Sequence, residues 1–232
     1  MDIKQGIFYG VGIGPGDPEL ITLKAVRTLE RCPVIAAPRT KSGAMLALDI
    51  VRRGMALEDK TILPLDFTMS RDPAVLHASH LEAAKAIESH LAAGRDVAML
   101  NLGDVSIYAT YGYLMDILIA RGYEAAMIPG VPSFCAVAAR LKTSLTTANG
   151  PLHILPGGVS ELEGQLDLPG TKVLMKSGSR IPQVARALQK RGLAERAAMV
   201  RDCGLPTEAV YQGLEQLPED AGYFATIIVK ER

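Results

Sequence analysis

The sequence has few residues that could support disulfides, redox centres or large aromatic surfaces. Its 232 residues contain no tryptophan and only three cysteines, Cys32, Cys135 and Cys203, which lie far apart and never form a Cys-x-x-Cys pair. An odd number of widely spaced cysteines argues against a disulfide framework and against a zinc knuckle. We therefore expect unpaired thiols and a cytoplasmic location.

An excess of charge of one sign is also missing. Twenty-five basic residues balance 25 acidic ones, so bulk charge predicts neither a nucleic acid nor a membrane surface as a partner. No apolar run approaches a membrane span, and the opening MDIKQGIFYG lacks the apolar core of a signal peptide. His77 and His80 lie three residues apart in a helical pattern, but spacing supplies no third ligand, so we expect no metal site.

What the chain does have is a regular alternation of strand-like and helix-like segments. Short apolar runs that stop at Gly, Pro or Asp predict strands at 7–11, 34–37, 61–65, 96–102, 124–128, 152–155, 172–176, 197–201 and 224–230. Helical patterns cover 20–30, 43–53, 73–93, 107–121, 133–141 and 181–191. The alternation predicts an α/β protein, which we divide near Arg121–Gly122 into an N-terminal domain (1–121) and a C-terminal domain (122–232).

The most unusual segment is GVGIGPGDPEL, residues 10–20, with glycine at alternate positions. A dinucleotide fingerprint needs glycine at i, i+2 and i+5, but the third position holds Pro15, Asp17 or Glu19 in the three registers. No lysine is placed for a phosphate loop either, and we expect Asp17 to cap the following helix. Two interpretations stay open: a tight strand-to-helix turn, or a bare backbone against which a large flat molecule lies.

Four further segments follow predicted strands and open toward helices. They are LGDVSIYATYGYL (102–114), IPGVPSFCAVAAR (128–140), VLMKSGS (173–179) and RDCGLPTE (201–208). Ligands of open α/β sheets bind beyond the carboxyl ends of strands, so these loops predict a cleft lined from several strand ends. Taken singly, Asp104 and Ser133 are expected to be helix N-caps.

In order along the chain, VGIGPGDPELIT, LGDVSIYATY, IPGVPSFCAVAAR, VLMK, EAVYQGLEQL and YFATIIV resemble the tetrapyrrole methylase family over nearly the whole sequence. The likeness is strongest to the branch that methylates C20 of precorrin-2 or cobalt-factor II in corrin biosynthesis. The resemblance implies a cytoplasmic homodimer of two-domain α/β subunits. It further implies S-adenosylmethionine, the methyl donor, bound in a cleft between the domains and released as S-adenosylhomocysteine. The small-molecule tetrapyrrole substrate would face the first glycine loop.

The resemblance also implies roles for particular residues. Those matched to cofactor binding are Leu102, Gly103, Asp104, Ile107, Ser133, Phe134, Met175 and Cys203. Those matched to the substrate are Gly14, Pro15, Gly16, Asp17, Arg39 and Tyr108. Arg39 and Lys41 would pair with substrate carboxylates, and Tyr108 or Tyr111 would orient the macrocycle. The chain departs from the family pattern in reading GDVS for GDP and PGVPS for PGxSS, where Pro132 removes one backbone N–H.

Methyl transfer to an electron-rich carbon needs positioning more than a covalent nucleophile, which agrees with the absence of nucleophile motifs from the sequence. One proton must leave C20, and the candidates for its acceptor are Asp104, a solvent molecule and an acetate of the substrate. The alternative functions are methylation at C11 or C17, at C2 and C7 of uroporphyrinogen, or of a protein residue. A non-catalytic tetrapyrrole carrier or sensor is a further alternative.

Overall fold

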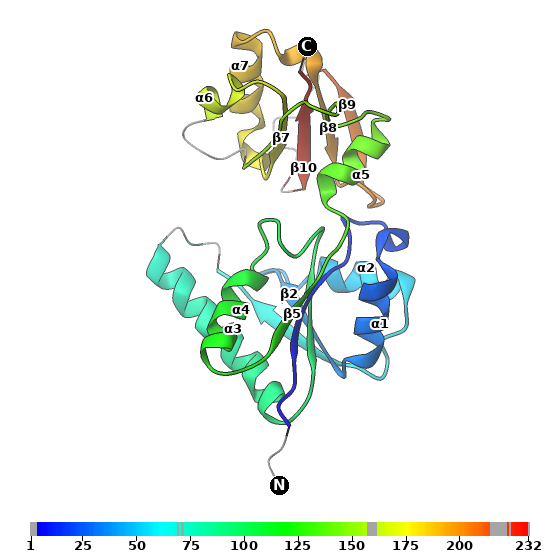
Figure 1. Ribbon diagram of the computed structural model, residues 1–232, viewed down its shortest axis with the longest axis vertical. Helices are drawn as coiled ribbons and strands as arrows, with labels where there is room; N and C mark the ends of the chain where they lie inside the picture. The colour runs from blue at the N-terminus through cyan, green and yellow to red at the C-terminus, as the bar shows by residue number, and fades with distance from the viewer. Residues whose placement is uncertain are drawn as a thin grey trace. The chain divides into compact units, whose positions relative to one another are not determined.

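A computed structural model describes residues 4–68, 70, 72–156, 162–213, 222 and 224–231, and the chain divides into two compact units (Figure 1). The units are Met1–Pro132 and Ser133–Arg232. The first unit extends beyond the expected division at Arg121–Gly122 because strand β5 (Ala125–Ile128) pairs with β1 in its sheet. Within the described ranges, no helix has both the length and the apolar character that crossing a bilayer requires.

The first unit is built on a parallel sheet of five strands in the order β3-β2-β4-β1-β5. Besides β5, the strands are β1 (Phe8–Gly12), β2 (Val34–Arg39), β3 (Thr61–Asp66) and β4 (Val97–Asn101). Because all five run in the same direction, their carboxyl ends and the loops that follow lie at one edge of the sheet. The predicted α/β class is therefore confirmed, and the sheet brings several strand-end loops together.

Helices cover both faces of this sheet. They are α1 (Leu23–Arg31), α2 (Leu46–Gly54), α3 (Pro73–Ala92) and α4 (Tyr111–Ala120), with a short 3-10 helix η1 (Pro18–Leu20) before α1. Figure 1 shows α3 and α4 on one side of the strands and α1 and α2 on the other. Strands buried on both faces need apolar residues at consecutive positions, and all five residues of β1 and of β4 are buried.

Tyr111 fills the core where α4 begins. Its ring lies 4.7 Å from that of Phe8 between centroids, and its hydroxyl donates to the carbonyl oxygens of Ala126 at 2.9 Å and Phe8 at 3.1 Å. Burial raises the pKa of Tyr111 to about 12. A Cβ at Gly10 would lie 2.6 Å from this ring, so the first glycine of the loop makes room for Tyr111. The expectation that Tyr111 orients a macrocycle is wrong, because its side chain is wholly buried.

Three helices, α1, α2 and α4, begin later than their apolar patterns predict. Helix α4 begins at Tyr111, whereas the pattern starts at residue 107, because Tyr108 has a left-handed backbone (φ 51°) that no α-helix accommodates. Asp104 is consequently not the N-cap of α4, a position that Thr110 occupies. Helix α1 is capped by Thr22, whose Oγ1 accepts from the Ala25 N–H at 3.2 Å.

The second unit contains a mixed sheet in the order β6-β7-β10-β8-β9. Its elements are α5 (Ser133–Arg140), β6 (Leu152–Pro156), α6 (Leu162–Leu166), β7 (Thr171–Met175), η2 (Gly178–Arg180), α7 (Ile181–Lys190), η3 (Ala194–Arg196), β8 (Ala197–Arg201), β9 (Ala209–Gln212) and β10 (Ala225–Val229). Strand β10 runs antiparallel to both β7 and β8. All five of its residues are buried, which confirms the prediction of a strand covered on both faces.

One strand and one α-helix of this unit, like its two 3-10 helices, have no counterpart in the sequence prediction. Strand β9 is a four-residue edge strand whose burial alternates between half-buried and exposed, so its apolar signal is weak. Helix α6 has five residues, too few to show a helical period. The EAVYQGLEQL segment contains β9, and its residues 214–217 lie outside the described part of the chain.

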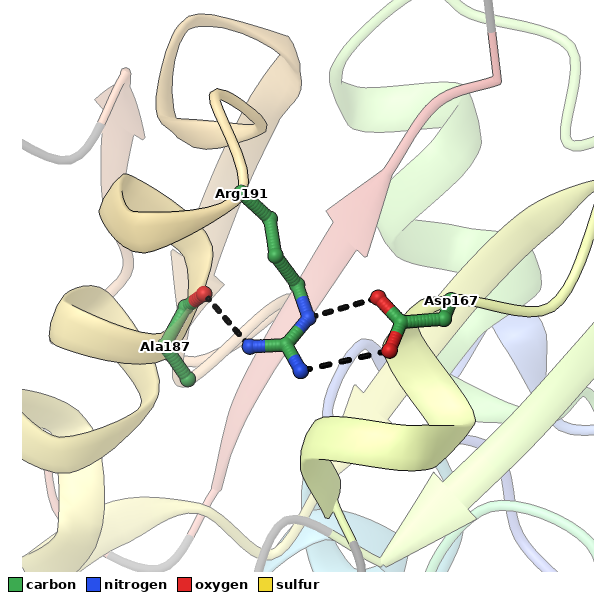
Figure 2. Close-up of polar contacts among 3 residues, drawn as sticks. All are labelled: Asp167, Ala187 and Arg191. Atoms are coloured by element: carbon green, nitrogen blue, oxygen red, sulfur yellow. Dashed lines mark hydrogen bonds and ion pairs between the residues drawn. The ribbon is translucent and has the colours of Figure 1, made fainter.

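An ion pair joins the segment after α6 to the end of α7 (Figure 2). Arg191 donates from Nε to Asp167 Oδ1 at 2.7 Å and from Nη2 to Oδ2 at 3.3 Å. A third hydrogen bond runs from Arg191 Nη1 to the carbonyl oxygen of Ala187 at 3.4 Å. These bonds hold the pKa of the Asp167 carboxyl below its usual value.

We expect Asp167→Asn to lower the melting temperature slightly at pH 7, and by less in acid. A carboxyl whose folded pKa is depressed stabilises the fold above its unfolded pKa and loses that contribution as pH falls through the folded value. The difference between wild type and variant should therefore shrink below about pH 4, as thermal melts at several pH values would measure. Asp116→Asn, which changes an exposed carboxylate on α4, is the control. A difference in melting temperature that grew in acid would contradict a stabilising role for the ionised Asp167 carboxylate.

Candidate functional site at the strand ends

The loops after β1 and β4 are joined through their backbones at the carboxyl edge of the first sheet. The Gly103 N–H donates to the Gly14 carbonyl at 2.8 Å, and the Gly14 N–H donates back to Gly103 at 3.2 Å. The Ile13 N–H donates to the Asn101 carbonyl at 3.0 Å. Gly14 has φ 74° and Gly103 φ 71°, a region in which glycine is strongly preferred. The opening glycine segment is thus tied directly to the loop that contains Asp104.

A third loop, after β5, packs on this pair with no room for side chains. A Cβ on Gly130 would lie 2.3 Å from the Gly103 carbonyl oxygen and 2.6 Å from the Gly12 carbonyl carbon. A Cβ on Gly12 would lie 2.6 Å from the Gly130 nitrogen. We refer to Gly12, Gly103 and Gly130 as the glycine junction. Gly10 and Gly12 therefore serve internal packing, as expected for a tight strand-to-helix turn.

Asp104 joins its own loop, after β4, to the loop after β5 at the glycine junction. Its Oδ2 accepts from the Gly130 N–H at 2.8 Å, and its Oδ1 accepts from the Ser106 N–H at 2.8 Å and also from the Ser106 hydroxyl. Burial raises the pKa of the Asp104 carboxyl, but hydrogen bonds from Ser106, Gly130 and Val105 outweigh burial and hold that pKa below its ordinary value. A carboxylate with these donors and a low pKa is a strong acceptor and a weak base.

The remaining residues predicted on this loop lie within a few positions of Asp104. Leu102 and Ile107 are half-buried, whereas the side chain of Tyr108 is exposed at the strained position described above. Strain of this kind concentrates at functional sites. The structure therefore brings Leu102, Gly103, Asp104 and Gly14 together and leaves Tyr108 at the surface beside them.

The second half of the opening loop forms a short capped turn. Asp17 accepts from the Glu19 N–H at 2.9 Å and caps η1, and not helix α1 as expected. The Gly16 carbonyl accepts from Arg53 Nη2 at 2.5 Å. Pro15 and Asp17 are both half-buried. These contacts hold the turn in place.

An open cavity of about 660 Å³ lies further along the same edge of the sheet. The residues that line it are Arg39, Thr40, Lys41, Ser42, Gly43, Asp66, Phe67, Thr68 and Ser79. Arg39 is the last residue of β2 and is the register partner of Asp66, the last residue of β3. The two predicted cations thus line one cavity, together with a carboxylate that the sequence prediction did not include.

In the second unit, two predicted residues follow neighbouring strand ends. Met175 ends β7 and is half-buried, whereas Cys203 follows β8 and is buried. Both strands are antiparallel to β10, so their carboxyl ends lie at the same edge of the sheet. Ser133 and Phe134 begin α5, which packs against β10.

The loop that carries Cys203 is pinned by Glu208. This carboxylate accepts from the Gly204 N–H at 2.9 Å and from Arg140 of α5. The hydrogen bond from Arg140 is the main reason that the pKa of Glu208 lies below its ordinary value. Asp202, at φ 52°, accepts from Thr207 at 2.9 Å across the same loop.

Ser177 is the functional candidate that sequence reasoning missed in this unit. It is fully buried in the loop after β7, yet its Oγ has no hydrogen-bond partner among the described residues. An unsatisfied buried hydroxyl costs about 1–3 kcal/mol. Its neighbour Lys176 has a left-handed backbone, φ 58°. VLMKSGS contains both residues, but only the burial of Ser177 distinguishes it from an ordinary loop serine.

Comparison with known proteins places these loops in a family. Residues 8–218 match the model of the tetrapyrrole (corrin/porphyrin) methylases. The chain is 33% identical to the cobalt-precorrin-2 C(20)-methyltransferase of Salmonella typhimurium, with 98% of each protein covered. It is 32% identical to the precorrin-2 C(20)-methyltransferase of a Sinorhizobium species, with 98% of this chain and 96% of that protein covered.

Solved structures agree with the sequence comparisons. The uroporphyrin-III C-methyltransferase of Thermus thermophilus, solved with S-adenosylhomocysteine, superimposes with a TM-score of 0.70 at 26% identity. That superposition covers 97% of this chain and 98% of the other. A cobalt-precorrin-4 methyltransferase, at 20% identity and a TM-score of 0.72, shares the fold. On the family match over most of its length and its near-complete alignment with two such enzymes, this chain belongs to the tetrapyrrole methylase family.

Proposed function

We propose that this protein transfers a methyl group from S-adenosylmethionine to C20 of precorrin-2 or of its cobalt-containing counterpart, in corrin biosynthesis. The observation that carries the proposal is the alignment over 98% of this chain with C20-methyltransferases. The joined strand-end loops of the first unit support it, because they bring Leu102, Gly103, Asp104 and Gly14 together at one edge of the sheet. By the same inference the protein acts in the cytoplasm as a homodimer, and light scattering coupled to gel filtration would test the dimer.

The residues present fit an adenosyl cofactor in two respects. Leu102 and Ile107, half-buried beside Asp104, offer apolar surface, and Ser177 offers a buried hydroxyl without a partner among the described residues. We assign cofactor binding to Leu102, Gly103, Asp104, Ile107, Ser133, Phe134, Met175 and Cys203. When bound, S-adenosylmethionine supplies an electrophilic methyl group on a sulfonium.

The contribution of the chain to the reaction is positioning. Groups held in a productive orientation lower a barrier by about 7–11 kcal/mol relative to free reactants, and rigid loops provide such an orientation. Asp104 fixes the loops after β4 and β5 relative to each other. Its saturated acceptors and low pKa favour this positioning role over that of the base that removes the C20 proton. A solvent molecule or a substrate acetate is then the better acceptor for that proton.

For the substrate we assign Gly14, Pro15, Gly16, Asp17, Arg39 and Tyr108, with Lys41 beside Arg39. The first four form the turn after β1, in which Pro15 and Asp17 are half-buried. Tyr108 presents an exposed ring at a strained position. Arg39 and Lys41 supply positive charge to the cavity, and bidentate pairing with a carboxylate suits a guanidinium.

The experiment that tests the function is a labelling assay. The purified protein is incubated with methyl-labelled S-adenosylmethionine and precorrin-2, with and without cobalt, and the product is analysed by NMR. We expect one new methyl group, at C20. Uroporphyrinogen III serves as the competing substrate. A methyl group at C2, C7, C11 or C17 would reassign the reaction, and the absence of S-adenosylhomocysteine binding in calorimetry would reject it.

Ser177→Ala separates a ligand contact from a structural role. If the hydroxyl binds the cofactor, the variant should bind S-adenosylhomocysteine about 5-fold more weakly, the equivalent of one ordinary hydrogen bond. The melting temperature of the free variant should stay the same or rise, because an unsatisfied buried hydroxyl is removed. The hydroxyl is fully covered in this structure, so binding requires the loop to shift, and strained Lys176 marks where its backbone would change.

Calorimetry and thermal melts measure the two outcomes for Ser177→Ala. Ser89→Ala is the control, because the Ser89 hydroxyl is exposed and donates to a carbonyl of its own helix. A lower melting temperature together with unchanged affinity would assign Ser177 to structure alone.

A further inference from the structure

The ion pair between Arg39 and Asp66 has a geometry that leaves part of the guanidinium unused. Arg39 donates from Nε to Asp66 Oδ1 at 2.9 Å and from Nη2 to Oδ2 at 2.6 Å. Both strands end at these residues, which face each other in the parallel register. The carboxylate therefore occupies the side of the guanidinium that carries Nε. Among the described residues, no acceptor bonds Nη1, and the end formed by Nη1 and Nη2 keeps two N–H groups for another carboxylate.

The cavity around this pair favours an anion. Arg39 and Lys41 contribute two positive charges and Asp66 one negative charge, so the lining carries a net charge of +1. In the described part of the chain, Lys41 forms no ion pair, while Arg39 is 39% exposed and reachable from solvent. A fixed guanidinium and a mobile ammonium in an open cavity suit a flexible carboxylate arm.

Hydroxyls of the lining accept hydrogen bonds from the backbone and so shape the wall. Ser79 accepts from the Thr68 N–H at 3.3 Å, and Thr68 accepts from the Ser70 N–H at 3.2 Å. Thr40 bonds to the backbone of Ala44. The loops after β2 and β3 are therefore braced, and Arg39 and Lys41 are the two cations of the lining.

We propose that Asp66 is a positioning residue for a carboxylate-binding site in this cavity. It holds the Arg39 guanidinium so that Nη1 and Nη2 bind one carboxylate arm of the tetrapyrrole. This proposal rests on the proposed function for the identity of the ligand. An unrestrained arginine loses rotamer freedom when it binds, and a partner that fixes it beforehand reduces that cost. If Asp66 instead competed with the ligand for Arg39, removal of the Asp66 carboxylate would strengthen binding of the ligand.

A double-mutant cycle tests the proposal. Asp66→Asn, Arg39→Ala and the double variant are titrated with precorrin-2 in the absence of methyl donor, and KM and kcat are then measured. The buffer contains about 0.3 M salt, which screens the long-range repulsion between the exposed Asp66 carboxylate and the anionic ligand. A change in binding then reports on the contact with Arg39. We expect Arg39→Ala to weaken precorrin-2 binding and raise KM about 10-fold. Asp66→Asn should do so about 3-fold, with kcat and S-adenosylhomocysteine affinity unchanged in both.

The decisive comparison is the effect of Asp66→Asn in the Arg39→Ala background. A residue that acts through Arg39 should have no effect there. Glu88→Gln is the matched control: it breaks another short ion pair, with Arg121 at 2.6 Å, and removes one negative charge from the same unit. Glu88 lies nine residues beyond Ser79 on α3, roughly 13 Å along the helix axis, and we expect no change in KM.

Three results would overturn the proposal. The first is tighter binding of precorrin-2 by Asp66→Asn, and the second is an equal effect of Asp66→Asn on binding in the wild-type and Arg39→Ala backgrounds. The third is unchanged binding of precorrin-2 in both single variants. Failure of the proposed function looks different. In that case the wild-type protein itself neither binds precorrin-2 nor methylates it, whereas the proposal for Asp66 fails on variants of an active enzyme.

Discussion

Gly130→Ala should strongly destabilise the first unit. The added Cβ would lie 2.3 Å from the Gly103 carbonyl oxygen and 2.6 Å from the carbonyl carbon of Gly12. Both contacts are with backbone, which has no rotamer to move aside, so the loops after β1, β4 and β5 would have to separate. We expect the free energy of unfolding to fall by about 3 kcal/mol or more. This is equivalent to a fall of about 6–12 °C in melting temperature for a chain of this size. Thermal and urea unfolding measure it.

The matched control for this prediction is Gly112→Ala. Gly112 lies in the first turn of α4, and nothing lies within 4 Å of a Cβ built there. Alanine is favoured over glycine in a helix by about 0.5–1 kcal/mol, so this variant should be as stable as wild type or more stable. If Gly130→Ala melted at the wild-type temperature, the close packing of the glycine junction would be refuted.

Asp104→Asn should have the second largest effect. An asparagine retains one acceptor oxygen but directs its NH₂ group toward N–H donors of Ser106 or Gly130, which leaves a buried donor unsatisfied. Hydrogen bonds to a charged acceptor contribute about 1.5–3 kcal/mol to stability. We therefore expect the free energy of unfolding to fall by about 2 kcal/mol. Affinity for S-adenosylhomocysteine should also fall, because the two loops that Asp104 joins would no longer be fixed.

The pH dependence of this effect follows from the pKa of Asp104. The folded pKa lies below the ordinary value of 3.8, so the carboxylate stabilises the fold above its unfolded pKa, and this contribution is lost as pH falls through the folded value. The difference in melting temperature between wild type and Asp104→Asn should be constant from about pH 5 to pH 8 and shrink below about pH 4.

A control and an alternative outcome complete the test of Asp104. Asp72 caps α3 by accepting from the Ala74 N–H at 2.9 Å, and asparagine caps helices as well as aspartate, so Asp72→Asn should be neutral. Unchanged stability for Asp104→Asn, with a large loss of kcat and an altered pH–rate profile, would instead identify Asp104 as the general base.

Much of the architecture was predictable from local patterns. Nine of the ten strands coincide with predicted apolar runs, because a buried strand requires consecutive apolar residues whatever its neighbours are. The late start of α4 was not predictable, because the apolar period of residues 107–121 continues through Tyr108. The left-handed backbone of that residue interrupts the pattern, in a loop where Asp104 and Ser106 are hydrogen-bonded to each other.

The division between the compact units illustrates the same limit. Residues 122–132 read as the start of a new α/β repeat, and only strand pairing shows that β5 completes the first sheet. Likewise, Asp66 directly follows the predicted strand 61–65 without any feature that indicates a partner. Its pairing with Arg39, 27 residues away in sequence, depends on the parallel register of β2 and β3.

The sequence by itself determined the α/β class, the order of most elements, the position of the glycine- and Asp104-containing loops after strands, and membership in the methylase family. Each of these depends on residue type and spacing along the chain. Only the tertiary structure decided what individual residues of those loops do. Gly10 makes room for Tyr111, Gly12 and Gly130 pack backbone on backbone, and Asp104 bonds a glycine 26 residues away. The physical reason is strand order: β1 pairs with β4 and β5 in the sheet, although β2 and β3 lie between β1 and these strands in the chain. Contacts between strands so far apart in the chain leave no periodic trace in the sequence.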